Sequence, residues 1–246
     1  MHIAVIGGTG LIGSQVVRDL DAAGHHPVPH SKSTGADVIT GEGLDAALTG
    51  ADVVVNLTNS PTFDDASSAF FRTSMNNLVD AARKADVGHF VVLSIVGVDQ
   101  VPELDYYRAK TLQEDILKAN PMPYSIVRAT QFMEFIDTVL SWTADDHTVR
   151  LPRTRLQPVA AADVAATVAE VAAGTPLRGT LELAGPDAYP LDELGHITLR
   201  AKGDSRSVTT DDTAGMFAAV NEDVLTPKGS ARIAPTRYTD WLARNA

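Results

Sequence analysis

Three side chains in the middle of the sequence have the types and the spacing for proton transfer. Tyr106 and Lys110 lie four residues apart in a predicted helix, so both project from one face, one turn apart. A nearby ammonium lowers the pKa of a phenol, which would let Tyr106 act as a general acid or base. Ser94 ends the preceding apolar run, and its hydroxyl could hydrogen-bond a substrate carbonyl. These residues predict carbonyl chemistry, with a chance pair of half-buried aromatics beside a lysine as the alternative.

A glycine-rich turn near the start of the chain has the spacing of a phosphate-binding site. Gly7, Gly10 and Gly13 follow an apolar run and stand where a helix is predicted to begin. Glycine allows a tight turn, close approach of a phosphate to main-chain N–H groups, and close packing of the helix on the sheet. The partly positive helix N-terminus also favours anions. Ser14 stands where a phosphate-loop nucleotidase needs lysine, so we predict dinucleotide binding, with an ordinary strand-to-helix turn as the alternative.

The residues after the second predicted strand bear on which nicotinamide dinucleotide is bound. An NAD site usually places a carboxylate about 20 residues after the glycines, where it holds the ribose 2′-hydroxyl. Ser31, Lys32 and Ser33 stand there instead, and an ammonium with two hydroxyls suits a 2′-phosphate that a carboxylate would repel. The sequence therefore predicts NADP(H) rather than NAD(H), unless Lys32 is only a solvated lysine in a turn.

The elements that must position these side chains alternate along the chain. Short apolar runs predict strands at 2–6, 27–31, 52–57, 89–94 and 124–128. Amphipathic patterns predict intervening helices at 11–23, 44–48, 66–85 and 106–119. Such alternation is typical of an α/β fold with a doubly wound parallel sheet, or Rossmann fold. Further along, we predict a strand at 180–183 and helices at 163–173, 192–201 and 238–243.

The looser pattern beyond the fifth predicted strand predicts a small lobe rather than a second domain. We expect one domain over residues 1–246, with about 131–160 and 185–246 contributing a C-terminal substrate-binding lobe. Gln131 and Phe132 follow the fifth strand, on the side where ligands bind in doubly wound sheets, and are candidate substrate contacts.

Composition excludes several classes of function. The 246 residues carry 20 basic and 31 acidic side chains, a formal net charge of -11, which argues against a nucleic-acid partner. The absence of cysteine excludes disulfides, thiolate nucleophiles and iron–sulfur clusters and fits a cytoplasmic protein. No apolar run approaches the roughly 18–20 residues of a membrane span, and the N-terminus predicts no secretory signal. We therefore expect a small-molecule substrate, no membrane partner, and a monomer or homodimer.

No metal site is predicted. His26 and His30 lie in a predicted strand, where they are too far apart to act as a helical ligand pair. The side chains of Asp145, Asp146 and His147 diverge, which is typical of a solvated turn.

The glycine turn, the serine-ended strand and the Tyr-x-x-x-Lys helix occur in an order that resembles the short-chain dehydrogenase/reductase superfamily. The resemblance covers almost the whole chain and is to the atypical branch that includes NmrA-like and isoflavone-reductase-like proteins. It extends to the segments 123–128 and 163–165. One departure is Leu93, which stands where many relatives have a second serine.

The resemblance implies an NADPH-dependent oxidoreductase that reduces a carbonyl, quinone or enone of a small organic molecule. Tyr106 would then give the proton, Lys110 would tune it and hold the nicotinamide ribose, and Ser94 would steady the oxyanion. The alternative is a non-catalytic NADP(H)-binding redox sensor of the NmrA type, although relatives of that type often lack the tyrosine. Besides Lys110, the implied cofactor contacts are Gly7, Thr9, Gly10, Leu11, Ile12, Gly13, Ser31, Lys32, Ser33, Asp37, Val38, Asn56, Leu57 and Thr58.

Overall fold

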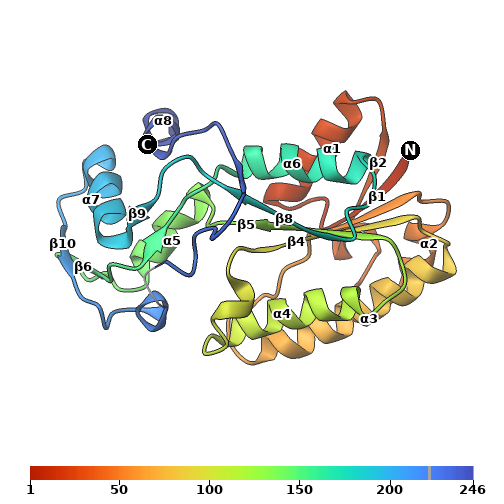
Figure 1. The fold of residues 1–246 in the computed structure, drawn as a ribbon, viewed down its shortest axis with the longest axis horizontal. Coiled ribbons are helices and arrows are strands. Elements are labelled where there is room, and N and C mark those ends of the chain that lie inside the picture. Colours follow the sequence, from red (N-terminus) through yellow and green to blue (C-terminus); the bar gives the residue numbers. More distant parts are fainter. Residues whose placement is uncertain (221–222, 246) are drawn as a thin grey trace. The chain divides into compact units, whose positions relative to one another are not determined.

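The computed structural model describes residues 1–220 and 223–245, and a seven-stranded sheet forms its centre (Figure 1). The strand order is β11-β8-β5-β4-β3-β1-β2, and the pairs β1-β2, β1-β3, β3-β4 and β8-β11 run parallel. From β1 the chain goes to β2 on one side and then returns to β3 on the other, which confirms the predicted doubly wound α/β fold. The strands are β1 (His2–Ile6), β2 (His26–His30), β3 (Val53–Asn56), β4 (His89–Ile95), β5 (Tyr124–Ala129), β8 (Gly179–Ala184) and β11 (Arg232–Ile233).

The position of each strand in the sheet follows from its sequence. All four residues of β3 and the last four of β1 are buried, as expected for apolar runs covered on both faces. The edge strand β2 contains Pro27 and Pro29, which have no N–H to offer to a further strand. These properties place β1 and β3 side by side at the centre, where the strand order reverses.

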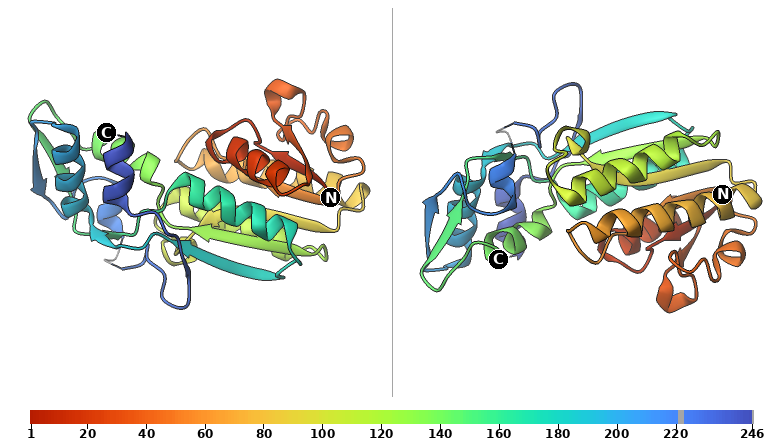
Figure 2. Two further views of the ribbon diagram at one scale, coloured as in Figure 1. Left: turned by 90° about the horizontal axis from the view of Figure 1, so that it is seen from above. Right: turned by 90° about the horizontal axis from the view of Figure 1, so that it is seen from below.

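Helices cover both faces of this sheet. Figures 1 and 2 show α1 (Leu11–Ala22) and α6 (Ala161–Ala173) on one face, and α3 (Ala66–Lys84) and α4 (Asp105–Lys118) on the other. The short helix α2 (Leu44–Leu48) packs against α3. Helix α1 buries Ile12, Val16 and Leu20, which recur every four residues along one stripe. The observed helices thus lie within two residues of the predicted bounds, because long amphipathic patterns are clear in sequence.

The chain divides into two compact units. The first comprises Met1–Ser94, Asp105–Arg128 and Val164–Leu181, and it contains the glycine turn, Tyr106 and Lys110. The second comprises Ile95–Leu104, Ala129–Asp163 and Glu182–Ala246. Most of the segments predicted to form a substrate-binding lobe belong to the second unit, and their use for substrate binding stays a prediction.

The second unit contains several elements that the sequence analysis did not identify. Strand β6 (Thr148–Leu151) pairs with β10 (Ser207–Thr210) in parallel, and β7 (Arg155–Leu156) pairs with β9 (Tyr189–Pro190) in antiparallel orientation. Its helices include α5 (Ile136–Ser141), which was not predicted, and α7 (Leu191–Lys202) and α8 (Tyr238–Asn245), which confirm the helices predicted at 192–201 and 238–243. The strands and α5 are too short to show a hydrophobic period. Single 3₁₀ turns occur in the first unit at Lys32–Thr34 and in the second unit at Val98–Gln100, Met133–Phe135 and Met216–Ala219.

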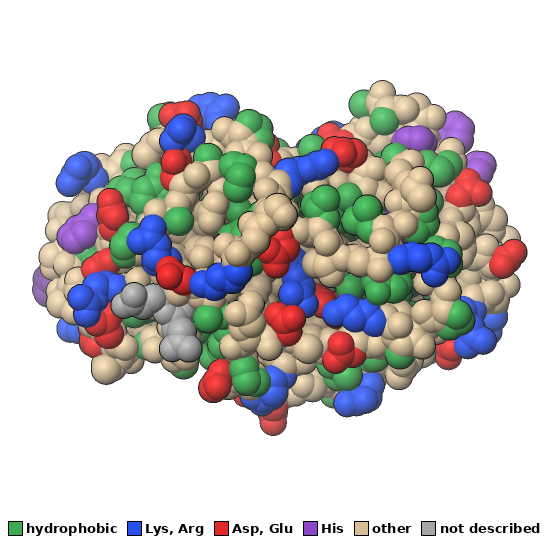
Figure 3. Space-filling model, viewed as in Figure 1, with side chains coloured by type: hydrophobic (Ala, Val, Ile, Leu, Met, Phe, Trp, Pro, Cys, Tyr) green, Lys and Arg blue, Asp and Glu red, His purple; other side chains and the backbone are tan. Residues whose placement is uncertain are grey.

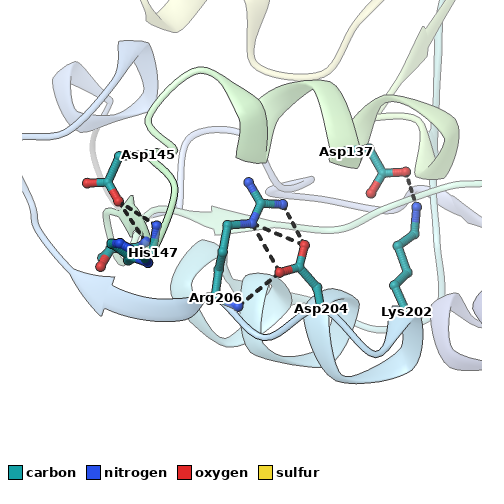
Figure 4. Close-up of polar contacts among 7 residues, drawn as sticks. Asp137, Asp145, His147, Lys202, Asp204 and Arg206 are labelled. Carbon is teal, nitrogen blue, oxygen red and sulfur yellow. Dashed lines mark hydrogen bonds and ion pairs between the residues drawn. The ribbon is translucent and has the colours of Figure 1, made fainter.

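Local polar contacts order the loops around α7 (Figure 4). Oδ1 of Asp145 accepts hydrogen bonds from the backbone N–H groups of His147 at 2.9 Å and Thr148 at 2.8 Å, which closes the turn before β6. After α7, the carboxylate of Asp204 bonds the guanidinium of Arg206 through Nε and one terminal nitrogen. Asp145 therefore shapes a turn, as its sequence context predicts.

Candidate functional site

The glycine turn has a shape that only glycine allows. Gly7 has a φ of 80°, and a Cβ on Gly13 would lie 2.1 Å from the Gly7 carbonyl oxygen. Helix α1 begins directly after Gly10, which has no side chain to cap it, and Thr9, Gly10 and Leu11 are exposed. The N-terminus of α1 thus presents backbone N–H groups at an open surface, as an anion site requires.

This shape leads to a paired prediction for two glycines of one turn. Gly13→Ala should lower the free energy of unfolding by about 1–3 kcal/mol, because its methyl group overlaps the backbone of Gly7. Gly10→Ala should have a smaller effect on stability, since its Cβ would lie 3.3 Å from the same oxygen, but it should weaken binding of the predicted dinucleotide. Urea unfolding without cofactor and fluorescence titration with NADPH measure the two effects. Equal stability losses in the two variants would contradict this account.

The loop after β3 lies directly against the glycine turn. A Cβ on Gly7 would approach the carbonyl carbon and oxygen of Leu57 to 3.0 Å. Buried Asn56 shapes this loop, because its Oδ1 accepts hydrogen bonds from the Thr58 N–H at 3.0 Å and the Thr58 hydroxyl at 2.8 Å. Residues 56–58 therefore lie beside the glycine turn, and the Asn56 side-chain oxygen is already used in hydrogen bonds within the loop.

The residues that follow β2 also lie beside the glycine turn. The Gly7 N–H donates to the carbonyl of His30 at 2.8 Å, which joins the glycine turn to the start of the Ser31–Thr34 turn. Ser31 caps this turn, and its hydroxyl lies 2.8 Å from that of Ser33. The cofactor contacts predicted from β1, β2 and β3 thus lie on neighbouring strand ends.

Lys32 has a partner that the sequence analysis did not identify. Its Nζ lies 3.2 Å from Oδ2 of Asp37, and 86% of the Lys32 side chain is exposed. Oδ1 of Asp37 accepts a hydrogen bond from the Ile39 N–H, and this bond, with Lys32, lowers the pKa of Asp37. The Lys32 ammonium thus faces solvent at the predicted 2′-phosphate position. Asp37 forms an ion pair with it and also closes the turn that includes Val38.

Tyr106 and Lys110 are both buried on α4, but their polar ends make different contacts. The Tyr106 hydroxyl donates a hydrogen bond of 2.5 Å to Oδ1 of Asn59. Nζ of Lys110 donates to the Leu93 carbonyl at 2.7 Å and to Oε1 of Gln113 at 2.5 Å. Asn59 lies one residue beyond the predicted 56–58 contacts. The signal that could have identified it is a polar side chain in the loop three residues after β3.

Burial shifts both pKa values toward the uncharged forms. It raises the pKa of Tyr106 to about 12, a rise that the hydrogen bond with Asn59 opposes. Burial likewise lowers the pKa of Lys110 to about 7, although the charge of Glu114 opposes this shift. The expected lowering of the Tyr106 pKa is therefore not found in the protein alone, because desolvation of the phenolate outweighs the hydrogen bond with Asn59.

Ser94 is part of a buried charged cluster. Glu114 has no exposed side-chain surface and accepts hydrogen bonds from Nε of Arg128 at 2.8 Å and from Nζ of Lys118 at 2.8 Å. Burial favours the neutral form of Glu114, but hydrogen bonds from Arg128 and Lys118, together with the adjacent Ser94 hydroxyl, lower its pKa. The Ser94 hydroxyl faces this carboxylate without the geometry of a regular hydrogen bond to any described group. A contact from Ser94 to a substrate, which stays a prediction, would require its hydroxyl to turn away from Glu114.

The candidate substrate contacts Gln131 and Phe132 belong to the second unit. Oε1 of Gln131 accepts a hydrogen bond from the Gln157 N–H at 3.4 Å, and Phe132 forms a parallel bridge with Val159. Nε2 of Gln131 is buried and has no hydrogen-bond partner among the described residues. The segment after β5 is therefore attached to 157–159, and Gln131 retains one unused donor.

The remaining features add little chemistry. Acidic and basic side chains are interspersed on the face shown in Figure 3. Within residues 1–220 and 223–245, no group of three or more His, Asp or Glu side chains could hold a metal ion. No helix of the described chain has the length and apolar character needed to cross a membrane.

Comparison with known proteins bears on this site. A family model described as NAD(P)H-binding matches residues 7–174, more than half of the chain. The photosystem II assembly factor Ycf39 of Cyanophora paradoxa is 28% identical over 151 residues, which cover 54% of this chain but only 46% of that protein. The (4-alkanoyl-5-oxo-2,5-dihydrofuran-3-yl)methyl phosphate reductase of Streptomyces griseus is 30% identical over 210 residues, 78% of this chain and 70% of that enzyme.

A solved structure supports the fold. The nucleoside-diphosphate-sugar epimerase of Staphylococcus aureus aligns with a TM-score of 0.76, covering 99% of this chain and 100% of that one. At 17% identity, this likeness concerns the fold alone.

Proposed function

The chain belongs to the NAD(P)H-binding family, within the atypical short-chain dehydrogenase/reductase branch, and from this premise we propose that it is an NADPH-dependent reductase. Its substrate would be a small organic molecule with a carbonyl, quinone or enone group. The observation that carries the proposal is the buried Tyr106–Lys110 pair on α4, in the same compact unit as the glycine turn. A relative named as a reductase, 30% identical, supports the same reaction class.

The residues present fit a dinucleotide. Because a Cβ on Gly13 would fill the space that lets α1 approach the turn, the N–H groups at the start of this helix can come close to a pyrophosphate. Thr9 to Gly13 would hold that group, Ser31 to Ser33 the 2′-phosphate, and Asp37 and Val38 the adenine. The loop at 56–58 would lie under the cofactor. The bound nicotinamide would supply the hydride.

The chain's own residues would move the proton. Tyr106 holds a proton on its hydroxyl oxygen and would give it to the substrate oxygen that becomes negative. Lys110 would hold the nicotinamide ribose and, when protonated, stabilise the phenolate. The negative charge of Glu114 favours the protonated form of Lys110 against the effect of burial. Gln131, with its unused amide donor, and Phe132 are the proposed substrate contacts.

One experiment tests the proposal directly. Purified protein is titrated with NADPH and NADH, and the oxidation of NADPH is then followed with a panel of quinones, diketones and enones. We expect tight NADPH binding and turnover of at least one acceptor class. Tight binding without turnover of any acceptor would favour a redox sensor instead.

Lys32 leads to a prediction about cofactor preference. Lys32→Ala should weaken NADPH binding about tenfold, the equivalent of about 1.4 kcal/mol, because a charge-assisted contact to the 2′-phosphate is lost. NADH binding should not change, since NADH has no 2′-phosphate. Lys84→Ala, which removes an exposed lysine paired with Asp45, is the matched control. Tighter binding of NADH than of NADPH by the wild-type protein would contradict the proposed preference for NADPH.

A further inference from the structure

The hydroxyl of Tyr106 is held by a residue outside the Tyr-x-x-x-Lys spacing. Its hydrogen bond of 2.5 Å goes to Oδ1 of Asn59, between β3 and α3. Lys110, one turn along α4, uses Nζ to bond the Leu93 carbonyl and Gln113. Asn59 is thus the polar neighbour of the oxygen that would lose a proton during reduction.

Tyr106 also lies against three aromatic rings. The Phe63 ring lies 4.9 Å from the Tyr106 ring, centroid to centroid, and the Phe71 and Tyr107 rings lie at 6.1 and 6.4 Å. Burial among these rings favours the neutral phenol over the phenolate, because it removes the negative oxygen from water. A phenolate formed here needs a hydrogen-bond donor from a nearby side chain.

The Asn59 carboxamide has both an acceptor and a donor. Oδ1 already accepts a hydrogen bond from the Tyr106 hydroxyl, while Nδ2 makes no hydrogen bond to another described group. The residue is exposed, and the final torsion of an asparagine side chain turns easily. A turn about the Cβ–Cγ bond would bring Nδ2 to the Tyr106 oxygen in place of Oδ1.

We propose that Asn59 is a positioning residue for proton transfer. Before the transfer, Oδ1 of its carboxamide accepts a hydrogen bond from the Tyr106 hydroxyl. After the transfer, Nδ2 donates a hydrogen bond to the Tyr106 phenolate. The inference rests on the proposed reductase function. In that reaction the bound nicotinamide would supply a hydride to the substrate carbon, and the π electrons of the C=O bond would move to oxygen. The O–H bond of Tyr106 breaks as its proton bonds to that oxygen, so the negative charge passes to Tyr106 and is met by Asn59.

Two substitutions at one position separate this role from a structural one. Asn59→Asp keeps an acceptor for the Tyr106 hydroxyl but loses the donor and adds a negative charge, whereas Asn59→Ala loses both. We expect kcat to fall about 10- to 100-fold in Asn59→Ala and further in Asn59→Asp, with KM for NADPH unchanged. A merely structural acceptor would be preserved by aspartate. Asn76→Ala, at an exposed asparagine on α3, is the control and should keep wild-type kcat.

The measurement follows NADPH oxidation with phenanthrenequinone, or with the best acceptor from the panel, over a range of pH. In the plot of kcat against pH, the limb that depends on Tyr106 should lie at higher pH in Asn59→Ala than in wild type. A second readout needs no turnover: the ¹³Cζ NMR signal of Tyr106, assigned with Tyr106→Phe, should move in unliganded Asn59→Ala and stay in Asn76→Ala. An unmoved signal, or an Asn59→Asp variant with wild-type kcat, overturns the inference.

The outcomes also separate this inference from the proposed function. If Tyr106→Phe loses activity while both Asn59 variants keep wild-type kcat, the reductase function stands and the role of Asn59 is wrong. If wild-type protein oxidises NADPH with none of the acceptors, the proposed function fails and the role of Asn59 in proton transfer fails with it.

Discussion

Replacing Tyr106 with phenylalanine is expected to reduce kcat about 10²- to 10⁴-fold, the usual contribution of a positioned general acid. The hydroxyl is the only group removed, and the ring keeps its contacts with Phe63 and Phe71. The substrate oxygen would then take its proton from water while bearing a full negative charge. The NADPH dissociation constant should not change, because the predicted phosphate contacts lie on other elements. Steady-state kinetics and a cofactor titration measure the two quantities.

Tyr107→Phe is the matched control for this experiment. Tyr107 is the adjacent residue on α4 and is also buried, with 4% exposed surface. The Tyr107→Phe variant should retain wild-type kcat, because Tyr107 is not the tyrosine of the Tyr-x-x-x-Lys pair with Lys110. A Tyr106→Phe variant that turns over as fast as wild type would show that hydride transfer here does not depend on the phenol.

Replacing Glu114 with glutamine is expected to lower the free energy of unfolding by about 3–5 kcal/mol, the cost of leaving a buried charge without its partner. The Glu114 side chain is fully buried and the Arg128 side chain is 10% exposed, so water cannot replace the lost carboxylate. Two guanidinium contacts, at 2.8 and 2.7 Å, lose their charged acceptor. Urea unfolding at neutral pH measures the loss.

The same cluster predicts a dependence of stability on pH. The folded-state pKa of Glu114 is below its ordinary value of 4.5, so the unfolded chain binds this proton more readily than the folded chain. The stabilisation is therefore present above about pH 4.5 and is lost as the pH falls through the folded-state pKa. Glu114→Gln should lack this part of the acid-induced loss.

An exposed ion pair provides the control for Glu114. Asp45→Asn removes the partner of Lys84, at a pair whose side chains are 69% and 66% exposed, and should cost about 0–1 kcal/mol. The double variant with Glu114 and Arg128 both replaced by leucine should be less destabilised than Glu114→Gln. A Glu114→Gln variant as stable as Asp45→Asn would contradict the buried-pair interpretation.

The amount that could be predicted from sequence differs between the two units. Helices α1, α3 and α4 and strand β3 bury one stripe or both faces, so their apolar residues recur at a readable period. The short strands β6, β7, β9 and β10 have two or four residues each and, unlike the buried run of β3, each contains residues that are partly or fully exposed. Their pairings join segments far apart in the chain, which no local pattern reports.

The parallel α/β fold, the glycine turn and the Tyr-x-x-x-Lys pair with Ser94 before it could all be predicted from the amino-acid sequence. These features depend on local properties, namely hydrophobic period, the conformational freedom of glycine and helical spacing. The hydrogen bond between Tyr106 and Asn59, the ion pair between Lys32 and Asp37, and the position of Ser94 beside Glu114 became visible in the folded chain alone. The physical reason is that hydrogen-bond partners and pKa values depend on which groups folding brings together and how deeply it buries them, and both are properties of the packed chain.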